Sequence, residues 1–181
     1  MSEARVLACI DGSAAGEAVC DYAAWASLQL NAPLALLHVL EPMPACAPAD
    51  LSGSIGLGSR EHLLSELAEV DERRARLLRE QGQLMLDAAA ERVRADGVSD
   101  PIVRQRHGRL VDTLQEVEAE VRLLVIGRQG EAGDSAASQV GSQLESVIRT
   151  LHRPILVAAG QFRAPKRVLV AFDNSPSVRK G

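Results

Sequence analysis

Aromatic residues are nearly absent from this sequence. Phenylalanine, tryptophan and tyrosine make up 2% of the 181 residues, so the chain offers few rings on which nucleic-acid bases could stack. A basic surplus is also missing, because the formal net charge at pH 7 is -4 and a nucleic-acid-binding surface needs clustered Lys and Arg. Both absences argue against a nucleic-acid-binding protein.

Long apolar runs are missing as well. No stretch approaches the ~20 apolar residues that a membrane-spanning helix needs, and the amino terminus lacks the apolar segment of a signal peptide. We therefore expect no membrane association and a cytoplasmic protein.

Cysteine and histidine are few and scattered. The three cysteines, Cys9, Cys20 and Cys46, show no C-x-x-C spacing, so neither a disulfide framework nor a thiolate metal site is indicated. The four histidines lie in different segments without an H-x-x-x-H pair, so a metal site would have to be assembled by the tertiary fold. We expect Cys9 and Cys20 to be small buried side chains.

Apolar segments alternate with segments of helical periodicity along most of the chain. Short apolar runs bounded by Gly, Pro or Asp predict buried strands; these are residues 5–10, 34–40, 101–107, 123–126 and 155–158. Periodic segments predict helices, at 13–30, 61–95, 112–120 and 140–151. Residues 42–59, rich in Pro, Gly, Ser and Ala, predict a loop. The charges of the long segment 61–95 indicate a solvent-exposed face more than a partner-binding one.

Three local signals accompany these elements. Ser13 is placed to cap the first helix, and Asn31 followed by Pro33 predicts its end. The third strand is short and polar, which is typical of a sheet edge. A stripe of small side chains along the first helix predicts that it approaches the sheet closely.

The alternation of strand and helix predicts an α/β domain with a doubly wound, five-stranded parallel sheet and helices on both faces. In the strand order 3-2-1-4-5 the ends of strands one and four meet where the winding direction reverses, which is where ligands bind in such sheets. We therefore expect Asp11 and Gly127 to face each other across one crevice. The Gly141-Ser142 pair at a helix start adds backbone N–H donors suited to a phosphate.

A partial repeat follows the domain. Residues 167–175 match residues 5–13 at Arg, Val, Leu, Asp and Ser, which favours duplication over a chance strand. We expect one domain at 1–160, a linker at 161–166 and the first strand and Asp loop of a second domain at 167–181. The chain would then be the first half of a two-domain protein.

Several motifs together resemble one known family. They are Asp11-Gly12-Ser13, His38-Val39, Gly127-x-x-Gly130, Gly141-Ser142 and His152-Arg-Pro-Ile-Leu-Val. Over residues 4–159 the chain resembles the universal stress protein family in its tandem-domain form. The resemblance implies an adenine nucleotide alpha hydrolase-like fold and a dimeric or pseudo-dimeric stress-response protein, of which one branch binds ATP.

The resemblance also implies a ligand site. The ATP-binding branch carries G-2x-G-9x-G-[ST], whereas ten residues separate Gly130 from Gly141 here. Asp11 would meet the ribose or a phosphate-bound metal, and Val39 and Ile126 would flank the adenine. The full implied set for ATP or AMP, with or without Mg²⁺, is Ile10, Asp11, Val39, Ile126, Gly127, Arg128, Gly130, Gly141 and Ser142.

Three functions stay open at this point. The first is an adenine-nucleotide sensor or regulator that acts on an unknown protein partner. The second is an interaction module of the same fold without nucleotide, which the added loop residue and the acids Glu131 and Asp134 favour because they would repel a triphosphate unless they hold Mg²⁺. The third is an adenylating enzyme; without a G-K-[ST] P-loop, at most slow ATP hydrolysis is expected.

Assembly is predicted from strand five. Ile155 to Ala158 would leave an apolar sheet edge with unpaired backbone groups, which proteins seldom leave open. We expect a homodimer or pseudo-dimer through this strand, with residues 167–172 free to pair with the neighbouring copy.

Overall fold

The computed structural model describes residues 4–42, 57–128, 142–169 and 171. The elements are β1 (Arg5–Cys9), α1 (Gly16–Leu30), β2 (Leu34–Leu40), α2 (Leu57–Ala95), β3 (Ile102–His107), α3 (Leu110–Val117), a 3₁₀ turn (Glu118–Glu120), β4 (Val121–Gly127), α4 (Ser142–Thr150) and β5 (Ile155–Ala158). No helix in this part of the chain is long and apolar enough to cross a membrane.

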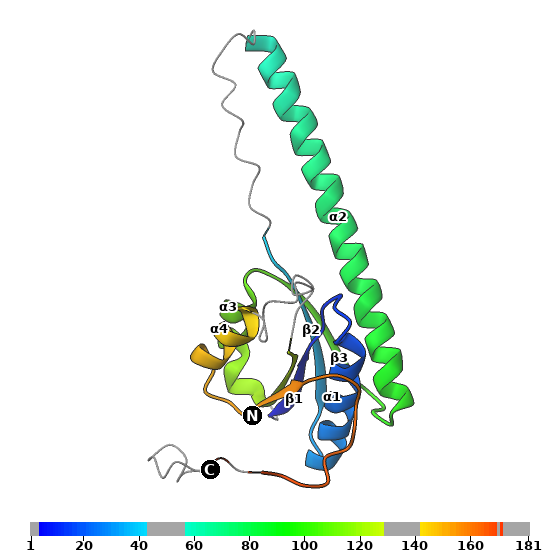
Figure 1. The fold of residues 1–181 in the computed structure, drawn as a ribbon. Coiled ribbons are helices and arrows are strands. Elements are labelled where there is room, and N and C mark those ends of the chain that lie inside the picture. Colours follow the sequence, from blue (N-terminus) through cyan, green and yellow to red (C-terminus); the bar gives the residue numbers. More distant parts are fainter. Residues whose placement is uncertain (1–3, 43–56, 129–141, 170, 172–181) are drawn as a thin grey trace.

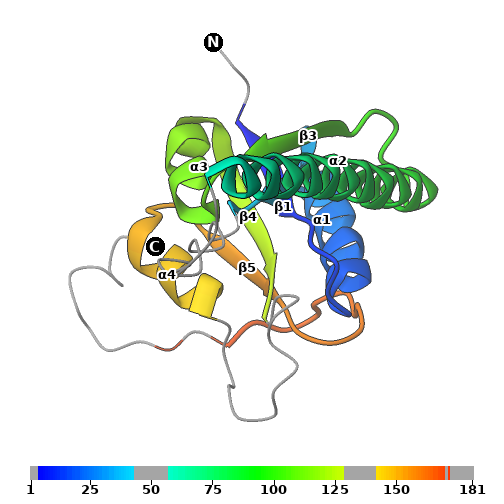
Figure 2. The ribbon, with the colours of Figure 1, turned by 90° about the horizontal axis from the view of Figure 1, so that it is seen from above.

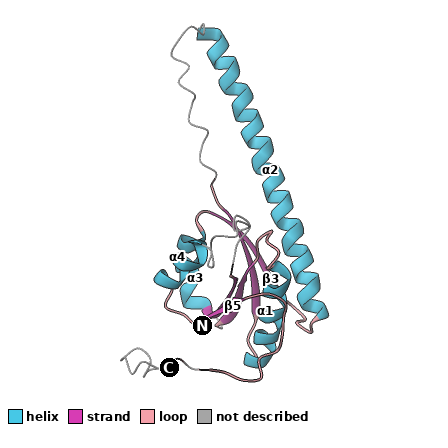
Figure 3. Cartoon of the chain, viewed as in Figure 1, coloured by secondary structure: helices cyan, strands magenta, loops and turns pink. Residues whose placement is uncertain are grey.

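The five strands form one parallel sheet in the order β3-β2-β1-β4-β5 (Figures 1 and 3). This order confirms the predicted topology, including the edge positions of β3 and β5. The chain winds from β1 towards β3 and then crosses back to β4, so the winding direction reverses between β1 and β4. That reversal positions the candidate site.

Two helices cover each face of the sheet (Figures 1 and 2). Helices α1 and α2 pack on one face over a core to which α1 contributes mostly alanines, and α3 and α4 pack on the other over a smaller core. Ala18, Ala23 and Ala26 of α1 are at most 6% exposed, which confirms that its small side chains bring it close to the sheet. Side chains of each strand alternate between the two cores, as the pleat requires.

The boundaries of α1 follow from local backbone chemistry, with one correction. Asn31 ends the helix in the left-handed conformation at φ 46°, which Asn tolerates better than most residues. The predicted cap at Ser13 is wrong, because the helix begins at Gly16 after Ala15 without a side-chain cap. The Ser13 hydroxyl donates instead to Asp11, and only its backbone carbonyl reaches the helix, at Gly16.

Helix α2 begins at Leu57, four residues before the predicted start, so the predicted loop at 42–59 is wrong for residues 57–59, and residues 43–56 lie outside the described part. Its 39 residues make it about 58 Å long. The carboxyl-terminal third packs on the sheet through Leu86, Ala90 and Val93. The rest extends beyond the sheet (Figure 1).

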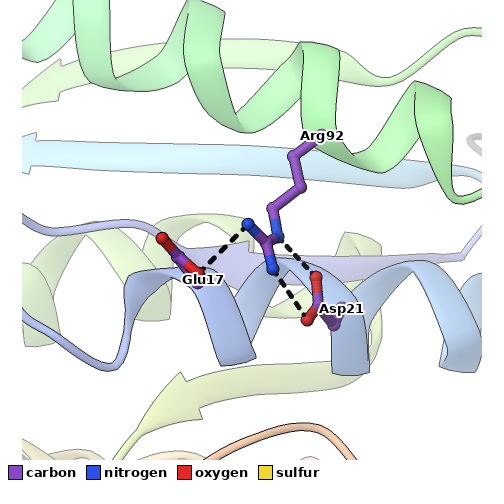
Figure 4. A network of polar contacts seen from close by, with 3 residues as sticks. All are labelled: Glu17, Asp21 and Arg92. Carbon is purple, nitrogen blue, oxygen red and sulfur yellow. Dashed lines mark hydrogen bonds and ion pairs between the residues drawn. The ribbon is translucent and has the colours of Figure 1, made fainter.

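An ion-pair cluster joins α1 to α2 (Figure 4). The Arg92 guanidinium donates from Nε to Asp21 Oδ1 at 2.5 Å and from a terminal nitrogen to Asp21 Oδ2 at 3.1 Å. Its other terminal nitrogen lies 3.2 Å from Glu17 Oε2. This two-pronged geometry ties the two helices together at a defined relative height.

The remaining boundaries differ from the expected ones by a few residues. Residues 118–120, predicted as helix, form the 3₁₀ turn, and α3 begins at Leu110. Strand β4 extends the predicted 123–126 at both ends. After β5 the chain runs back past α1, where the Phe162 ring contacts Tyr22 edge-on with centroids 4.9 Å apart.

Candidate functional site

The carboxyl-terminal ends of β1 and β4 lie side by side. The two strands pair with Ala8 opposite Val125, and continuing that register by two residues sets Ile10 beside Gly127. Asp11 therefore follows one strand at the place where Arg128 follows the other. The two turns predicted to share a crevice do leave the sheet at neighbouring positions.

Asp11 forms a tight local turn. Its Oδ1 accepts hydrogen bonds from the Ser13 backbone N–H at 3.2 Å and from the Ser13 hydroxyl at 2.5 Å. This Asx turn holds the carboxylate beside the end of β1 rather than at a helix cap. Asp11 is half-buried.

A buried histidine holds the backbone just before Asp11. His38 of β2 is 8% exposed, and its Nδ1 lies 2.8 Å from the Ile10 carbonyl oxygen. A carbonyl only accepts hydrogen bonds, so Nδ1 carries the proton. The sequence marked His38 only as part of a motif; a polar side chain inside an otherwise apolar strand was the available signal for this contact.

The ring of His38 fits under α2 because residue 82 is glycine. A Cβ at Gly82 would lie 2.6 Å from His38 Cδ2 and 2.2 Å from Gln105 Nε2. Gln105 Nε2 donates to the Arg79 carbonyl at 3.2 Å. Helix α2 therefore packs directly onto two polar side chains, and one of them, His38, bonds the backbone just before Asp11.

The apolar residues that were predicted to contact the ligand lie on both faces of the sheet. Ile126, 7% exposed, and the half-buried Val39 belong to the core under α3 and α4. Ile10 is 6% exposed and belongs to the opposite core. The structure brings Val39 and Ile126 to one face of the sheet and places the Ile10 side chain on the other.

The polar part of the predicted site is described only in part. Gly127 is half-buried, the exposed Arg128 donates its backbone N–H to the Ala158 carbonyl at 3.1 Å, and the exposed Ser142 is the first residue of α4. Gly130 and Gly141, with Glu131 and Asp134, lie outside the described residues.

Glu41 is a further residue at this edge that the sequence interpretation missed. Its Oε1 accepts from the Leu110 backbone N–H at 3.3 Å and from Gln143 Nε2 at 2.8 Å. One carboxylate thus links the end of β2 to the first turns of α3 and α4, where helix N-termini favour negative charge. The available signal was its position directly after strand two, at the same sheet edge as Asp11.

The thiol next to this site is unreactive. Burial, together with the nearby charge of Asp11, raises the pKa of Cys9 to about 12, so it stays a thiol at neutral pH and makes a poor nucleophile. Among the described residues, no group of three or more His, Cys, Asp or Glu side chains could hold a metal ion. The arrangement suits ligand binding by backbone and carboxylate groups.

Comparison with known proteins agrees with this geometry. A model of the universal stress protein family matches residues 4–159. The chain belongs to that family. A universal stress protein of Synechocystis is 32% identical over 178 residues, which are 97% of this chain and 62% of the relative. The chain therefore spans less than two thirds of the length of that universal stress protein.

Solved universal stress proteins share the fold. UspA of Lactobacillus plantarum has a TM-score of 0.60 and 18% identity, with 88% of this chain and 99% of that chain covered. A universal stress protein in complex with cAMP has a TM-score of 0.57 and 22% identity, with 88% and 99% covered. At these identities the likeness establishes the α/β fold common to the family.

Proposed function

We propose that this universal stress protein binds an adenine nucleotide, ATP or AMP, at the edge where β1 and β4 end, and that it acts as a sensor or regulator rather than as a fast catalyst. The observation that carries the proposal is the juxtaposition of the Asp11 turn and Gly127 at the point where the winding reverses, which is where open α/β sheets bind ligands. The relative in complex with cAMP supports an adenine nucleotide as the ligand class.

In this proposal each residue has a separate task. Asp11 accepts a hydrogen bond from the ribose or holds a phosphate-bound Mg²⁺, and Val39 and Ile126 supply the apolar contact for adenine. Gly127 lets the ligand approach the backbone, while Gly130, Gly141, Ser142 and Arg128 surround the phosphates. Ile10, whose side chain faces the opposite core, contributes only its backbone.

Glu41 favours a second candidate function. Its carboxylate accepts a hydrogen bond from the side chain of Gln143, the residue after Ser142. A phosphate bound at the start of α4 would therefore lie close to a negative charge. An interaction module that keeps α3 and α4 joined through Glu41, and binds its partner regardless of nucleotide, is the alternative. Under the first proposal Glu41 must release Gln143 or share the phosphate through Mg²⁺.

Calorimetry on the purified chain separates the two functions. ATP and AMP are titrated with and without Mg²⁺ into the wild type, Asp11→Ala, Gly127→Val and Glu41→Gln. Nucleotide binding should be lost in the first two variants and strengthened in Glu41→Gln, because removing that charge relieves repulsion of the phosphates. Asp87→Ala, an exposed change on α2, is the control and should bind as the wild type does.

Two results decide against the nucleotide proposal. The first is no heat of binding at millimolar ATP or AMP while circular dichroism shows the folded chain. The second is binding that Asp11→Ala and Gly127→Val leave unchanged, because the ligand would then occupy another place. Turnover of ATP at the rate of buffer alone is expected in either case, and a fast turnover would favour the enzyme hypothesis.

Assembly, domain division and localisation stay proposals as well. Strand β5 is an open edge of the sheet, which supports a homodimer or pseudo-dimer through Ile155 to Ala158. Residues 167–169 are exposed and outside any strand, and a second domain beginning there rests on the sequence repeat. The protein is expected in the cytoplasm. Gel filtration of the wild type at micromolar concentration tests the dimer, and elution as a strict monomer would contradict it.

A further inference from the structure

Helix α2 carries large apolar side chains that are exposed to solvent. Residues 62–77 are exposed throughout, and this part of α2 extends beyond the sheet (Figure 1). The exposed fractions are 41% for Leu63, 52% for Leu64, 55% for Leu67, 63% for Val70, 54% for Leu77 and 70% for Leu84. A helix alone in water gains little from such residues, because helical stability in proteins comes mostly from packing an apolar face.

These side chains recur with the period of a coiled coil. Leu63, Val70, Leu77 and Leu84 follow each other at intervals of seven residues, which is the spacing of the d positions of a heptad. The matching a positions hold Leu67, Arg74 and Gln81. The apolar d column runs over three heptad intervals, whereas Leu67 is the one apolar residue among these three a positions.

This seam points away from the sheet. With 3.6 residues per turn, Val93 lies about 180° around the helix from Leu84, and Val93 is fully buried against the sheet. Leu86 and Ala90 lie on the buried side as well. Helix α2 therefore has two apolar faces, one covered by its own domain and one open.

We propose that the open face pairs with α2 of a second copy of this chain in an antiparallel coiled coil. The charges beside the seam favour this arrangement over a parallel pair, because only the antiparallel pair brings opposite charges together. In a parallel pair, Glu66 at a g position would face Asp71 at the next e position of the second copy, a repulsive contact. In an antiparallel pair g faces g. Arg73 then faces Glu80 of the second copy, and Glu80 faces its Arg73, which are attractive contacts, while Glu66 faces Asp87 of the second copy, which is a repulsive one.

The same register buries the whole apolar column. It sets Leu67 opposite Leu84, Val70 opposite Gln81 and Arg74 opposite Leu77 of the second copy. The two-fold axis then falls between Ala75 and Arg76, at the midpoint of the 39-residue helix, so the helices overlap over nearly their full length. Such an interface is self-complementary, as a two-fold dimer requires.

Two polar positions lie within the seam. Arg74 and Gln81 occupy a positions, and polar residues there lower stability while they specify register. Glu80 also contacts Arg76 of its own helix at 3.6 Å, so pairing with Arg73 of the second copy competes with this contact. The surface is separate from the nucleotide edge and from β5, so it stands whether or not those proposals hold.

Analytical ultracentrifugation of the full chain tests the contact. Val70→Glu with Leu77→Glu places unpaired charges in the seam and should raise the dimer dissociation constant by roughly 100-fold or more. The measured mass should then fall to that of a monomer, or, if β5 also pairs two copies, from that of a larger assembly to that of a dimer. The matched control is Ser65→Glu with Ala68→Glu, which adds two glutamates on exposed positions beside the seam and should keep the wild-type mass.

A charge exchange tests the direction of the helices. Arg73→Glu alone puts like charges opposite each other and should weaken the dimer roughly tenfold, and adding Glu80→Arg should restore it. A monomeric wild type, an assembly whose mass Val70→Glu with Leu77→Glu leaves unchanged, or a double exchange that fails to restore the wild-type mass would each overturn the proposal. Circular dichroism of every variant checks that α2 remains helical.

Discussion

At the scale of single residues, Gly82 decides how closely α2 approaches the sheet. The position lies inside a helix, where glycine normally lowers stability by about 0.5 to 1 kcal/mol relative to alanine. Here a Cβ would lie 2.2 Å from Gln105 Nε2 and 2.6 Å from His38 Cδ2. Those side chains cannot both give way, because His38 is bonded to the Ile10 carbonyl.

We expect Gly82→Ala to destabilise the protein, against the usual rule for helices. Overpacking costs about 1 to 3 kcal/mol, which exceeds the gain in helix propensity. Urea denaturation followed by circular dichroism measures the change. Adding Gln105→Ala should recover part of the loss, and Gln83→Ala, an exposed neighbour, should be close to neutral. A more stable Gly82→Ala variant would show that the helix does not press on His38.

Cys20 gives the stability a pH dependence. Burial raises the pKa of Cys20 to about 11, with Asp21 adding to the rise and Arg92 opposing it. In the unfolded chain the thiol loses its proton near its ordinary pKa of 9.0, so above pH 9 unfolding releases a proton and the free energy of unfolding falls.

The expected loss between pH 9 and 11 is about 2 kcal/mol relative to a Cys20→Ala variant, taking ~1.4 kcal/mol per pKa unit. Below pH 8 the difference between the two proteins should be constant. Denaturation curves across this pH range measure it. If the free energies of unfolding of the wild type and the variant change in parallel from pH 9 to 11, the folded state does not raise the pKa of Cys20.

At the scale of elements, the contact between α1 and α2 depends on Arg92. Its side chain is 40% exposed and that of Asp21 is 20% exposed, so solvent screens part of the attraction. The hydrogen bond to Asp21 is the main reason that the pKa of Arg92 lies above its usual value. The two-pronged geometry seen in Figure 4 makes this pair stronger than an ordinary surface ion pair.

We expect Arg92→Ala to lower the free energy of unfolding by about 1 kcal/mol. Arg92→Lys should recover only part of this loss, because lysine keeps the charge but cannot bond both oxygens of Asp21 at once. Arg94→Ala, at an exposed position on the same helix, is the control. Thermal melts at low and high salt measure the effect, and equal melting temperatures for Arg92→Ala and wild type would contradict it.

At the scale of the whole molecule, the segment after β5 is anchored on α1. Phe162 contacts Tyr22 at an interplanar angle of 79°, and the Arg163 backbone N–H lies 3.4 Å from the Tyr22 hydroxyl oxygen. An aromatic pair of this kind contributes about 0.5 to 1.5 kcal/mol beyond its buried area. It brings residues 160–163 back to the face that carries α1 and α2.

Phe162→Ala should release this segment without unfolding the domain. Trypsin cleaves after Arg and Lys, and Arg163, Lys166 and Arg167 follow the anchor directly. Cleavage there should be faster in Phe162→Ala, while the melting temperature changes little. Val168→Ala, at an exposed position 85% accessible to solvent, is the control. Cleavage of Phe162→Ala at the wild-type rate would mean that the ring does not hold the segment.

Most of the architecture could be predicted from local patterns in the sequence. Runs such as residues 34–40 and 155–158 are apolar because their strands are covered on both faces, and the polar third strand shows its edge position directly. Asn31 ends α1 because its left-handed backbone needs no distant partner. Burial and periodicity are properties of a segment and its immediate neighbours, so strand order and helix placement follow from composition and topological rules.

Which side chains contact each other across the sequence could be learned only from the tertiary structure. Ser13 bonds Asp11 rather than the helix, Glu41 reaches two helices more than 60 residues away, and His38 meets Ile10 and Gly82 at once. Ile10 and Ile126 are both apolar at strand ends, yet strand register sends them to opposite cores. Such contacts depend on how strands align and how helices are set on the sheet, so the chain order determines the edge where the site lies, and packing determines which side chains meet there.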